Sequence, residues 1–267
     1  RSDSLPIQEV FRQATVSHNY ALGLDILVTL RTLLMEAESQ VDAIVNRSFT
    51  DDLTMVPVFE GGFYEPAALD GSRRAAFYAG FTGREAYFDM PTRVYHETYP
   101  GLHLQFSMVQ ASDLTTFRKA QRIPPFDEGW AYYAETLAWE MGLYEDNPNA
   151  NLGRLQQALI RAAQLVVDTG IHAYGWTTEE AARYFVEAAG IGRPEANDLV
   201  LLQLAQPGAA VSAAIGAAFI MDLREQAEAE LGADFDLREF HTLLLSGGSL
   251  PLRFLAERVG VWVIGRE

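Results

Sequence analysis

The sequence predicts a mainly α-helical fold built as a single domain over residues 1–267, with at most one or two short strands. Through most of the chain, apolar residues recur every three or four positions, which is the period of a helix with one buried face. Helix-capping residues precede several of these periodic segments. No internal repeat or low-complexity linker divides the chain, and its length is sufficient for one sizeable core.

The N-terminal third is expected to contain one long helix followed by irregular backbone. Apolar residues at helical spacing run from about Ser17 to Arg47. Glycines, prolines and aromatic residues then crowd the segment from Phe59 to Phe81, which indicates turns and loops. The end of that segment, Ala75 to Phe81, is the only plausible strand, and helix resumes near Asp89.

The rest of the chain is expected to be almost entirely helical. Pro124-Pro125 interrupts the chain before this region begins. Long helices are expected over 127–143, 152–173 and 209–231, and small residues in the last would allow close packing. Shorter helices are marked by the residues that start them: Thr177 with Glu180 ahead of a helix ending at Gly190, Asp236 with Glu239, and Pro251.

The composition argues against several classes of partner. A net charge of −16 and an isoelectric point near 4.7 disfavour binding to nucleic acid or to an anionic membrane. The absence of cysteine excludes disulfides and thiolate metal sites. The most apolar run, Ala209 to Met221, is too short to span a membrane. Arg1 opens the chain without a signal-peptide pattern, which slightly favours a cytoplasmic location.

The stretch from His96 to His103, with the sequence HETYPGLH, carries the densest set of chemically active side chains. It holds two of the five histidines in the chain. A Glu directly after His96 matches the HExxH zinc motif, in which two histidines hold zinc and the Glu is the general base. A catalytic zinc site has three protein ligands and an open position for water. We therefore predict a zinc site with His96 as a ligand and Glu97 as the base that activates water.

The second ligand leaves two alternatives open. Four residues after His96 stands Pro100, which cannot bind a metal, and His103 comes seven residues after His96. On a straight helix the Cα of His103 would lie about 10 Å along the axis from that of His96. A kink at Pro100 and Gly101 would bring the two imidazole rings to one ion. Otherwise they are two unrelated histidines on either side of a helix kink.

A third ligand is expected from the helix over 127–143. Glu128 and Glu135 lie two turns apart on one face of it, so the spacing allows either. Asp168 and His172 lie one turn apart on the next helix, and form either a helix-end ion pair or a carboxylate that orients an oxyanion-stabilising imidazole. The two remaining histidines have no motif around them and are expected to be structural: His18 and His241.

Together these stretches resemble a family of bacterial zincin-like proteins of unknown function, related to the gluzincins and marked by the motif HExxPGHH. The other motifs of that family are EGWAxYAE, DTGxH and a GSLPL-type segment, and all occur here in the same order. The resemblance covers about Phe63 to the C-terminus, which is the C-terminal half of the longer family architecture. It implies a zincin-like helical metallopeptidase fold. It also implies that Glu128 is the third metal ligand and that Glu135 lies in the second shell around the metal.

The sequence departs from the family pattern at several positions. Leu102 replaces the first His of the HExxPGHH pair, and if that His is the ligand, this site has lost one. Leu202-Gln203 replace an Arg-Tyr pair, while Ala209 and Ala213 replace a Gln and a Tyr. A Tyr at such a place would donate to the oxyanion in a peptidase. The resemblance therefore implies weakened or altered chemistry in a more apolar cleft.

The predicted function is that of a zinc-dependent, metallopeptidase-like hydrolase in which metal-activated water attacks an amide or ester carbonyl. His96, His103 and Glu128 would hold the zinc, Glu97 would be the base, and His172 would stabilise the oxyanion. Two alternatives stay open: a diverged biosynthetic enzyme acting on a small apolar molecule, and a non-catalytic partner subunit. The expected partner is a peptide or small-molecule substrate, and a second chain is the candidate supplier of the other half of the cleft.

Overall fold

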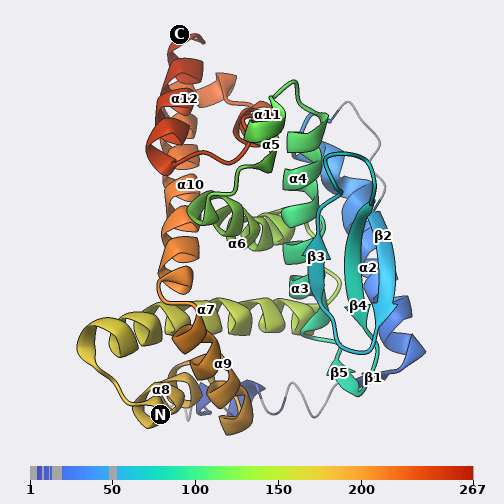
Figure 1. The fold of residues 1–267 in the computed structure, drawn as a ribbon, viewed down its shortest axis with the longest axis vertical. Coiled ribbons are helices and arrows are strands. Elements are labelled where there is room, and N and C mark those ends of the chain that lie inside the picture. Colours follow the sequence, from blue (N-terminus) through green and yellow to red (C-terminus); the bar gives the residue numbers. More distant parts are fainter. Residues whose placement is uncertain (1–4, 8, 12, 14–19, 48–52, 267) are drawn as a thin grey trace.

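A computed structural model describes residues 5–7, 9–11, 13, 20–47 and 53–266 of the chain. This part of the chain is mainly helical, as predicted, with short strands near its N-terminal end (Figure 1). The predicted structural role of His18 falls outside the described residues. The helices are α2 (Leu24–Gln40), α3 (Met90–Glu97), α4 (Leu102–Ala111), α5 (Thr116–Ala120), α6 (Pro124–Glu140), α7 (Pro148–Tyr174), α8 (Thr178–Ala189), α9 (Arg193–Ala205), α10 (Ala209–Leu231), α11 (Leu237–Ser246) and α12 (Leu252–Ile264), with 3-10 turns at Val41–Ala43 and Gly232–Asp234.

The prediction of at most one or two strands was wrong, because the described residues form five. Strand β4 (Ala75–Gly80) lies where a strand was expected, and it is the centre of a three-stranded sheet. It pairs in parallel with β2 and antiparallel with β3. The missed strands are short or contain proline, so local pattern did not reveal them: β1 (Tyr20–Leu22), β2 (Leu53–Val58), β3 (Phe63–Glu65) and β5 (Arg84–Ala86).

Several helix ends confirm the capping predictions. Thr177 and Glu180 form a complete capping box at the start of α8, and Gly190 ends that helix in the left-handed conformation. The Asp236 side chain accepts hydrogen bonds from two backbone N–H groups at the start of α11. The Pro124-Pro125 pair does not separate two elements, since it forms the first turn of α6, where proline costs no intrahelical hydrogen bond.

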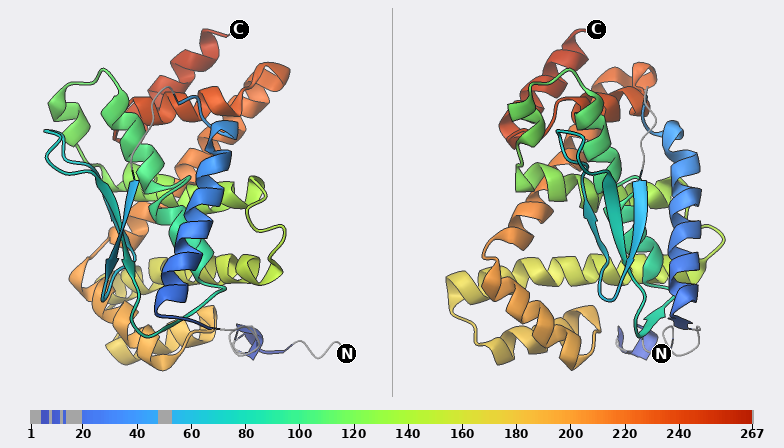
Figure 2. Two further views of the ribbon diagram at one scale, coloured as in Figure 1. Left: turned by 90° about the vertical axis from the view of Figure 1, so that its right-hand side faces the viewer. Right: turned by 45° about the vertical axis from the view of Figure 1, so that its right-hand side comes forward.

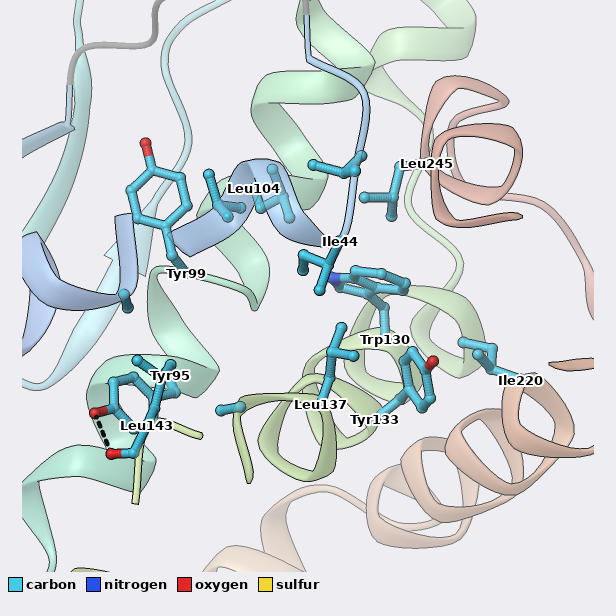
Figure 3. Packing of buried hydrophobic residues seen from close by; sticks show 14 of the residues in the cluster. Ile44, Tyr95, Tyr99, Leu104, Trp130, Tyr133, Leu137, Leu143, Ile220 and Leu245 are labelled. Carbon is cyan, nitrogen blue, oxygen red and sulfur yellow. Dashed lines mark hydrogen bonds between the residues drawn. The ribbon is translucent and has the colours of Figure 1, made fainter. Parts of the chain in front are cut away.

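Helix α6 lies in the middle of the molecule and packs against α10, which runs along one side in the view of Figure 1, and small residues allow their close contact. A Cβ atom on Gly129 would overlap the backbone of Gly216, and one on Gly216 would overlap the carbonyl of Pro125. The predicted role of the small residues in 209–231 is therefore confirmed at this crossing. Large side chains, including Trp130 and Tyr133, fill the main core around α6 (Figure 3).

Four helices converge beside the sheet and surround the candidate site. The α3–α4 pair lies next to β3, while α6 and α7 approach α3 from the other side (Figures 1 and 2). Among the described residues, no single helix is both long and apolar enough to cross a membrane. The pair α9 and α10, bent by 90° at their junction, meets those two criteria together.

Candidate functional site

The candidate site is built around His96, a buried residue in the last turn of α3. Its Nδ1 atom lies 2.7 Å from Oε1 of Glu135, and its Nε2 atom lies 3.8 Å from Oε2 of Glu128. An ionised carboxylate only accepts hydrogen bonds, so Nδ1 carries the proton. In the neutral ring the lone pair of Nε2 therefore faces Glu128, which is the arrangement of a histidine ready to bind a metal or accept a proton.

Glu135 is kept ionised by Arg161 of α7. Burial alone would raise the pKa of this carboxyl, but the guanidinium of Arg161 and the hydrogen bond from His96 outweigh it and lower the pKa. Arg161 contacts both carboxylate oxygens, with its Nε 3.2 Å from Oε2. Its guanidinium also lies over the ring of Tyr132, 3.9 Å from the centroid. Arg161 and Tyr132 were not predicted, because neither stands at a metal-ligand spacing in the sequence.

Glu97 lies next to this group and is held by the sheet. Its Oε2 accepts a 2.8 Å hydrogen bond from the backbone N–H of Tyr64 in β3. Burial raises the pKa of Glu97, and the neighbouring charge of His96 and the Tyr64 hydrogen bond oppose this rise only in part. A carboxyl whose pKa is raised in this way is better matched to proton transfer near neutral pH than an exposed one. No sequence signal indicated the contribution of Tyr64.

Glu128 and Glu135 occupy one face of α6, as their spacing predicted, and both reach His96. They do so at different nitrogens, which separates their roles. Glu135 is buried and fixes the ring through Nδ1, whereas the Glu128 side chain is 48% exposed and faces Nε2. Glu135 therefore orients the His96 ring, while Glu128 faces its other nitrogen, and the predicted ligand role of Glu128 stays a prediction.

The break between α3 and α4 is held by α6. Pro100 has no N–H to continue the helix, and a Cβ on Gly101 would overlap the carbonyl of His96. The indole N–H of Trp130 lies 3.1 Å from the carbonyl oxygen of Pro100 and 3.2 Å from that of Gly101. Trp130 and the Pro100-Gly101 pair therefore form one structural contact between α6 and the break.

His103 follows this break in the first turn of α4. The Nδ1 atom of His103 lies 3.2 Å from the Tyr64 hydroxyl and 3.4 Å from Oγ of Ser107, and its ring packs against Tyr99. The predicted role of His103 as a metal ligand stays a prediction. Among the described residues, no three His, Asp or Glu side chains are placed to hold one metal.

Leu102, the residue before His103, lies on the side of the site. It packs in a small apolar cluster with Phe106 of α4 and Ala131 of α6, against which Tyr64 also packs. Ala131 is one turn of helix from Glu128, so Leu102 packs against the part of α6 that carries Glu128. That Leu102 takes the place of a metal ligand stays a prediction.

Asp168 and His172 form a separate group at the far end of α7. The Nε2 atom of His172 lies 3.0 Å from the carbonyl oxygen of Gln203 and 3.7 Å from Oδ1 of Asp168. The same Asp168 oxygen accepts a 3.0 Å hydrogen bond from the N–H of Gly208, where α10 begins. His172 comes eleven residues after Arg161, or about 16 Å along the helix. These contacts link three helices, and the predicted oxyanion role of His172 stays a prediction.

Comparison with known proteins identifies the family. Residues 38–259 match a family described as bacterial protein of unknown function, DUF885. The chain belongs to this family. No protein in the curated set matches it.

Two solved structures share the fold. One is described as the putative lipoprotein from Colwellia psychrerythraea, with 30% identity and a TM-score of 0.90 over 97% of this chain. The other is a putative lipoprotein of unknown function from Shewanella oneidensis, with 22% identity and a TM-score of 0.80 over 94% of this chain. The match covers 47% and 48% of those chains, so the present chain spans about half the length of each.

These findings correct the predicted family. The zincin-like, gluzincin-related identification was wrong, because the DUF885 family is described only as of unknown function and neither neighbour is described as a zincin or a peptidase. The motifs behind that identification also have structural explanations. Trp130 holds the break before Leu102, and Asp168 binds the start of α10, so their presence does not require peptidase chemistry.

Proposed function

We propose that this protein is a hydrolase that works with a weakly held divalent metal ion, zinc by preference, and that it acts on an amide or ester carbonyl. The observation that carries the proposal is the state of His96. Its proton is held at Nδ1 by Glu135, and Nε2 faces the carboxylate of Glu128 at 3.8 Å. Few roles other than metal binding or proton transfer use a buried imidazole in this way.

The donor set fits zinc in kind but is short by one ligand. Imidazole nitrogen and carboxylate oxygen are zinc ligands with bonds of about 2.0–2.2 Å, so two such atoms on one tetrahedral ion lie about 3.3 Å apart. A small movement of the exposed Glu128 side chain would close the observed 3.8 Å to that spacing. With Leu102 where a third ligand would lie, we expect affinity well below that of a three-ligand site.

The chemistry expected from the chain itself is proton transfer by Glu97. A bound divalent ion would activate water and polarise the substrate carbonyl. Glu97, held in place by the N–H of Tyr64 and with a raised pKa, would take a proton from the nucleophile and pass it to the leaving group. Arg161 and Glu135 would keep His96 in the productive tautomer. The zincin-like form of the helical fold stays a prediction, and this site does not require it.

The decisive experiment is to restore the third ligand with Leu102→His. We expect the variant to bind zinc at least about 100-fold more tightly than the wild type, because a third protein ligand completes a catalytic zinc site. Isothermal titration with zinc measures this change. Leu104→His is the control, since Leu104 is on the same helix but belongs to the main core. Equal zinc affinity in wild type and Leu102→His, with both variants folded, would rule out the proposed metal position.

Leu102 also favours a second candidate function. It packs in an apolar cluster with Phe106 and Ala131, on the part of α6 that carries Glu128. This supports a diverged protein without peptidase activity, either a biosynthetic enzyme for a small apolar molecule or a non-catalytic partner of a second chain. The wild type would then bind no zinc up to millimolar concentration and cleave no peptide or ester, while Leu102→His would gain zinc binding without turnover.

A further inference from the structure

A cavity opens between the connection from β3 to β4 and the α4–α5 pair. It has a volume of about 530 Å³ and is lined by the segment from Ala67 to Ala75, which connects β3 to β4, and by one face of α4 and α5. Figure 2 shows this segment extending beside α5 in both views. The buried residues His103 and Ser107 lie on its inner wall. This volume is within the range of pockets that hold small organic ligands.

The charge of this cavity is opposite to that of the whole protein. The chain carries 36 acidic and 20 basic residues, yet the cavity is lined by three cations and no carboxylate. The cations are Arg73, Arg74 and Lys119. Clefts lined by one sign of charge concentrate ligands of the opposite sign. Apolar side chains complete the lining, including Leu69 and Leu114.

The cavity walls are tied together by hydrogen bonds that leave part of the positive charge available. Gln110 of α4 donates to the carbonyl of Ala67 at 2.7 Å, and Nζ of Lys119 donates to the carbonyl of Gln110 at 2.7 Å. Arg73 is paired with Glu65 at 3.1 Å, so its charge is largely neutralised. Lys119 has three N–H donors and uses one of them within the described residues, which leaves two for a ligand.

Tyr64 connects this cavity to the candidate site. Its backbone N–H binds Glu97, and its hydroxyl lies 3.2 Å from Nδ1 of His103, which lines the cavity. A ligand in the cavity therefore lies one tyrosine side chain away from the proposed base.

We propose that this cavity binds the carboxylate of an organic acid with an apolar body, with Lys119 as the charged contact. The further step, that this acid is the end of the hydrolysed substrate, rests on the proposed function. It would make the preferred substrate one with a free carboxylate, such as the C-terminal residue of a peptide or an N-acyl amino acid. Binding of the acid itself does not require metal or turnover.

The test is a titration of the metal-free full chain with N-acetyl-leucine, followed by heteronuclear NMR. We expect saturable shifts at residues lining the cavity, and at least tenfold weaker binding of the neutral N-acetyl-leucinamide. Lys119→Gln should weaken binding of the acid about tenfold. Arg253→Gln is the control, because Arg253 is an exposed arginine of α12 outside the cavity.

The outcomes separate this proposal from the hydrolase. Equal binding of acid and amide, no binding of either, or undiminished binding in folded Lys119→Gln would overturn the carboxylate site, whatever the zinc titrations show. Sulfate that competes as well as the organic acid would also overturn it, since the apolar wall would then contribute nothing. If the protein binds the carboxylate but binds no zinc, the proposed carboxylate site stands and the proposed hydrolase is rejected.

Discussion

Two buried histidines, both in contact with α6, are held in opposite ways. His241 has no exposed surface and hydrogen-bonds through both ring nitrogens to uncharged groups, with Nδ1 2.8 Å from the carbonyl oxygen of Ile44 and Nε2 2.8 Å from the hydroxyl of Tyr133. Burial lowers the pKa of His241 to about 3, so it stays neutral. His96 instead donates to an ionised carboxylate and turns its other nitrogen toward the exposed Glu128.

The difference lies in whether the ring keeps a nitrogen that can bind a ligand. A ring whose two nitrogens are both bonded to neutral core groups has no capacity left for a ligand. A ring oriented by a buried ion pair, with its second nitrogen facing a movable carboxylate, has that capacity. The same helix builds both environments, because Tyr133 and Glu135 lie two residues apart on α6 and so point about 200° apart around its axis. Trp130 and Tyr133 in Figure 3 belong to the closed environment.

The largest expected effect is the loss of stability when His241 is replaced. His241→Ala removes two buried hydrogen bonds and leaves a cavity beside Trp130, so we expect a loss of about 3–5 kcal/mol in the free energy of unfolding. His96→Ala should cost about 1 kcal/mol, since Arg161 still neutralises Glu135. Urea unfolding of both variants at pH 7 measures the difference. Equal losses would mean that His96 is as structural as His241.

An intermediate effect is expected at Glu135, the carboxylate that orients the ring of His96. Glu135→Gln leaves Arg161 without its buried partner, and because the Arg161 side chain is 22% exposed we expect a loss of about 2 kcal/mol rather than the full cost of a buried pair. Glu140→Gln, which breaks the more exposed contact with Arg224, is the matched control and should cost less than about 1 kcal/mol.

The stability of Glu135→Gln should also depend on pH differently from that of the wild type. The folded pKa of Glu135 is depressed, so its contribution to stability is complete above the pKa of an unfolded Glu, about 4.3, and is lost as the pH falls through the lower folded value. Wild type should therefore lose more stability than Glu135→Gln in that acid range. Parallel stability curves for the two proteins below pH 4.3 would contradict the ion-pair assignment.

The sequence was sufficient for features that depend on neighbours along the chain. The capping box of Thr177 and Glu180 and the placement of Glu128 and Glu135 on one face follow from helix period alone. The sequence was insufficient where the interacting residues lie far apart along the chain. Arg161 is 26 residues from Glu135 on another helix, and neither periodicity nor motif spacing encodes that pairing.

The break at Pro100-Gly101 shows the same limit in one element. Residue type alone predicts that the helix breaks there. The direction of the chain after the break depends on Trp130, some 30 residues away, whose indole N–H contacts the two carbonyl groups at the break. His103, just after the break, contacts Tyr64 and lines the cavity. The strands β2 and β3 were missed for the related reason that each is defined by pairing to β4 rather than by its own pattern.

The smallest expected effect is a gain in stability, and it is expected from a substitution of Glu97. It tests whether the carboxylate of Glu97 makes the fold less stable. Burial raises the pKa of Glu97, so the fold favours its protonated form. The stability gained from this preference is complete below the pKa of an unfolded Glu and is lost as the pH rises through the folded pKa. Glu97→Gln keeps an oxygen that can accept from the N–H of Tyr64 but cannot ionise.

We therefore expect Glu97→Gln to be more stable than wild type at pH 7, by less than about 1 kcal/mol, and equal to it at pH 4. Thermal unfolding at the two pH values measures this, with Glu187→Gln on the exposed face of α8 as the control that should show no such crossing. If Glu97→Gln is less stable than wild type at pH 7, the carboxylate is a structural anchor like the partners of His241. A gain in stability together with loss of any hydrolytic turnover would instead mark Glu97 as a residue kept for chemistry rather than for folding.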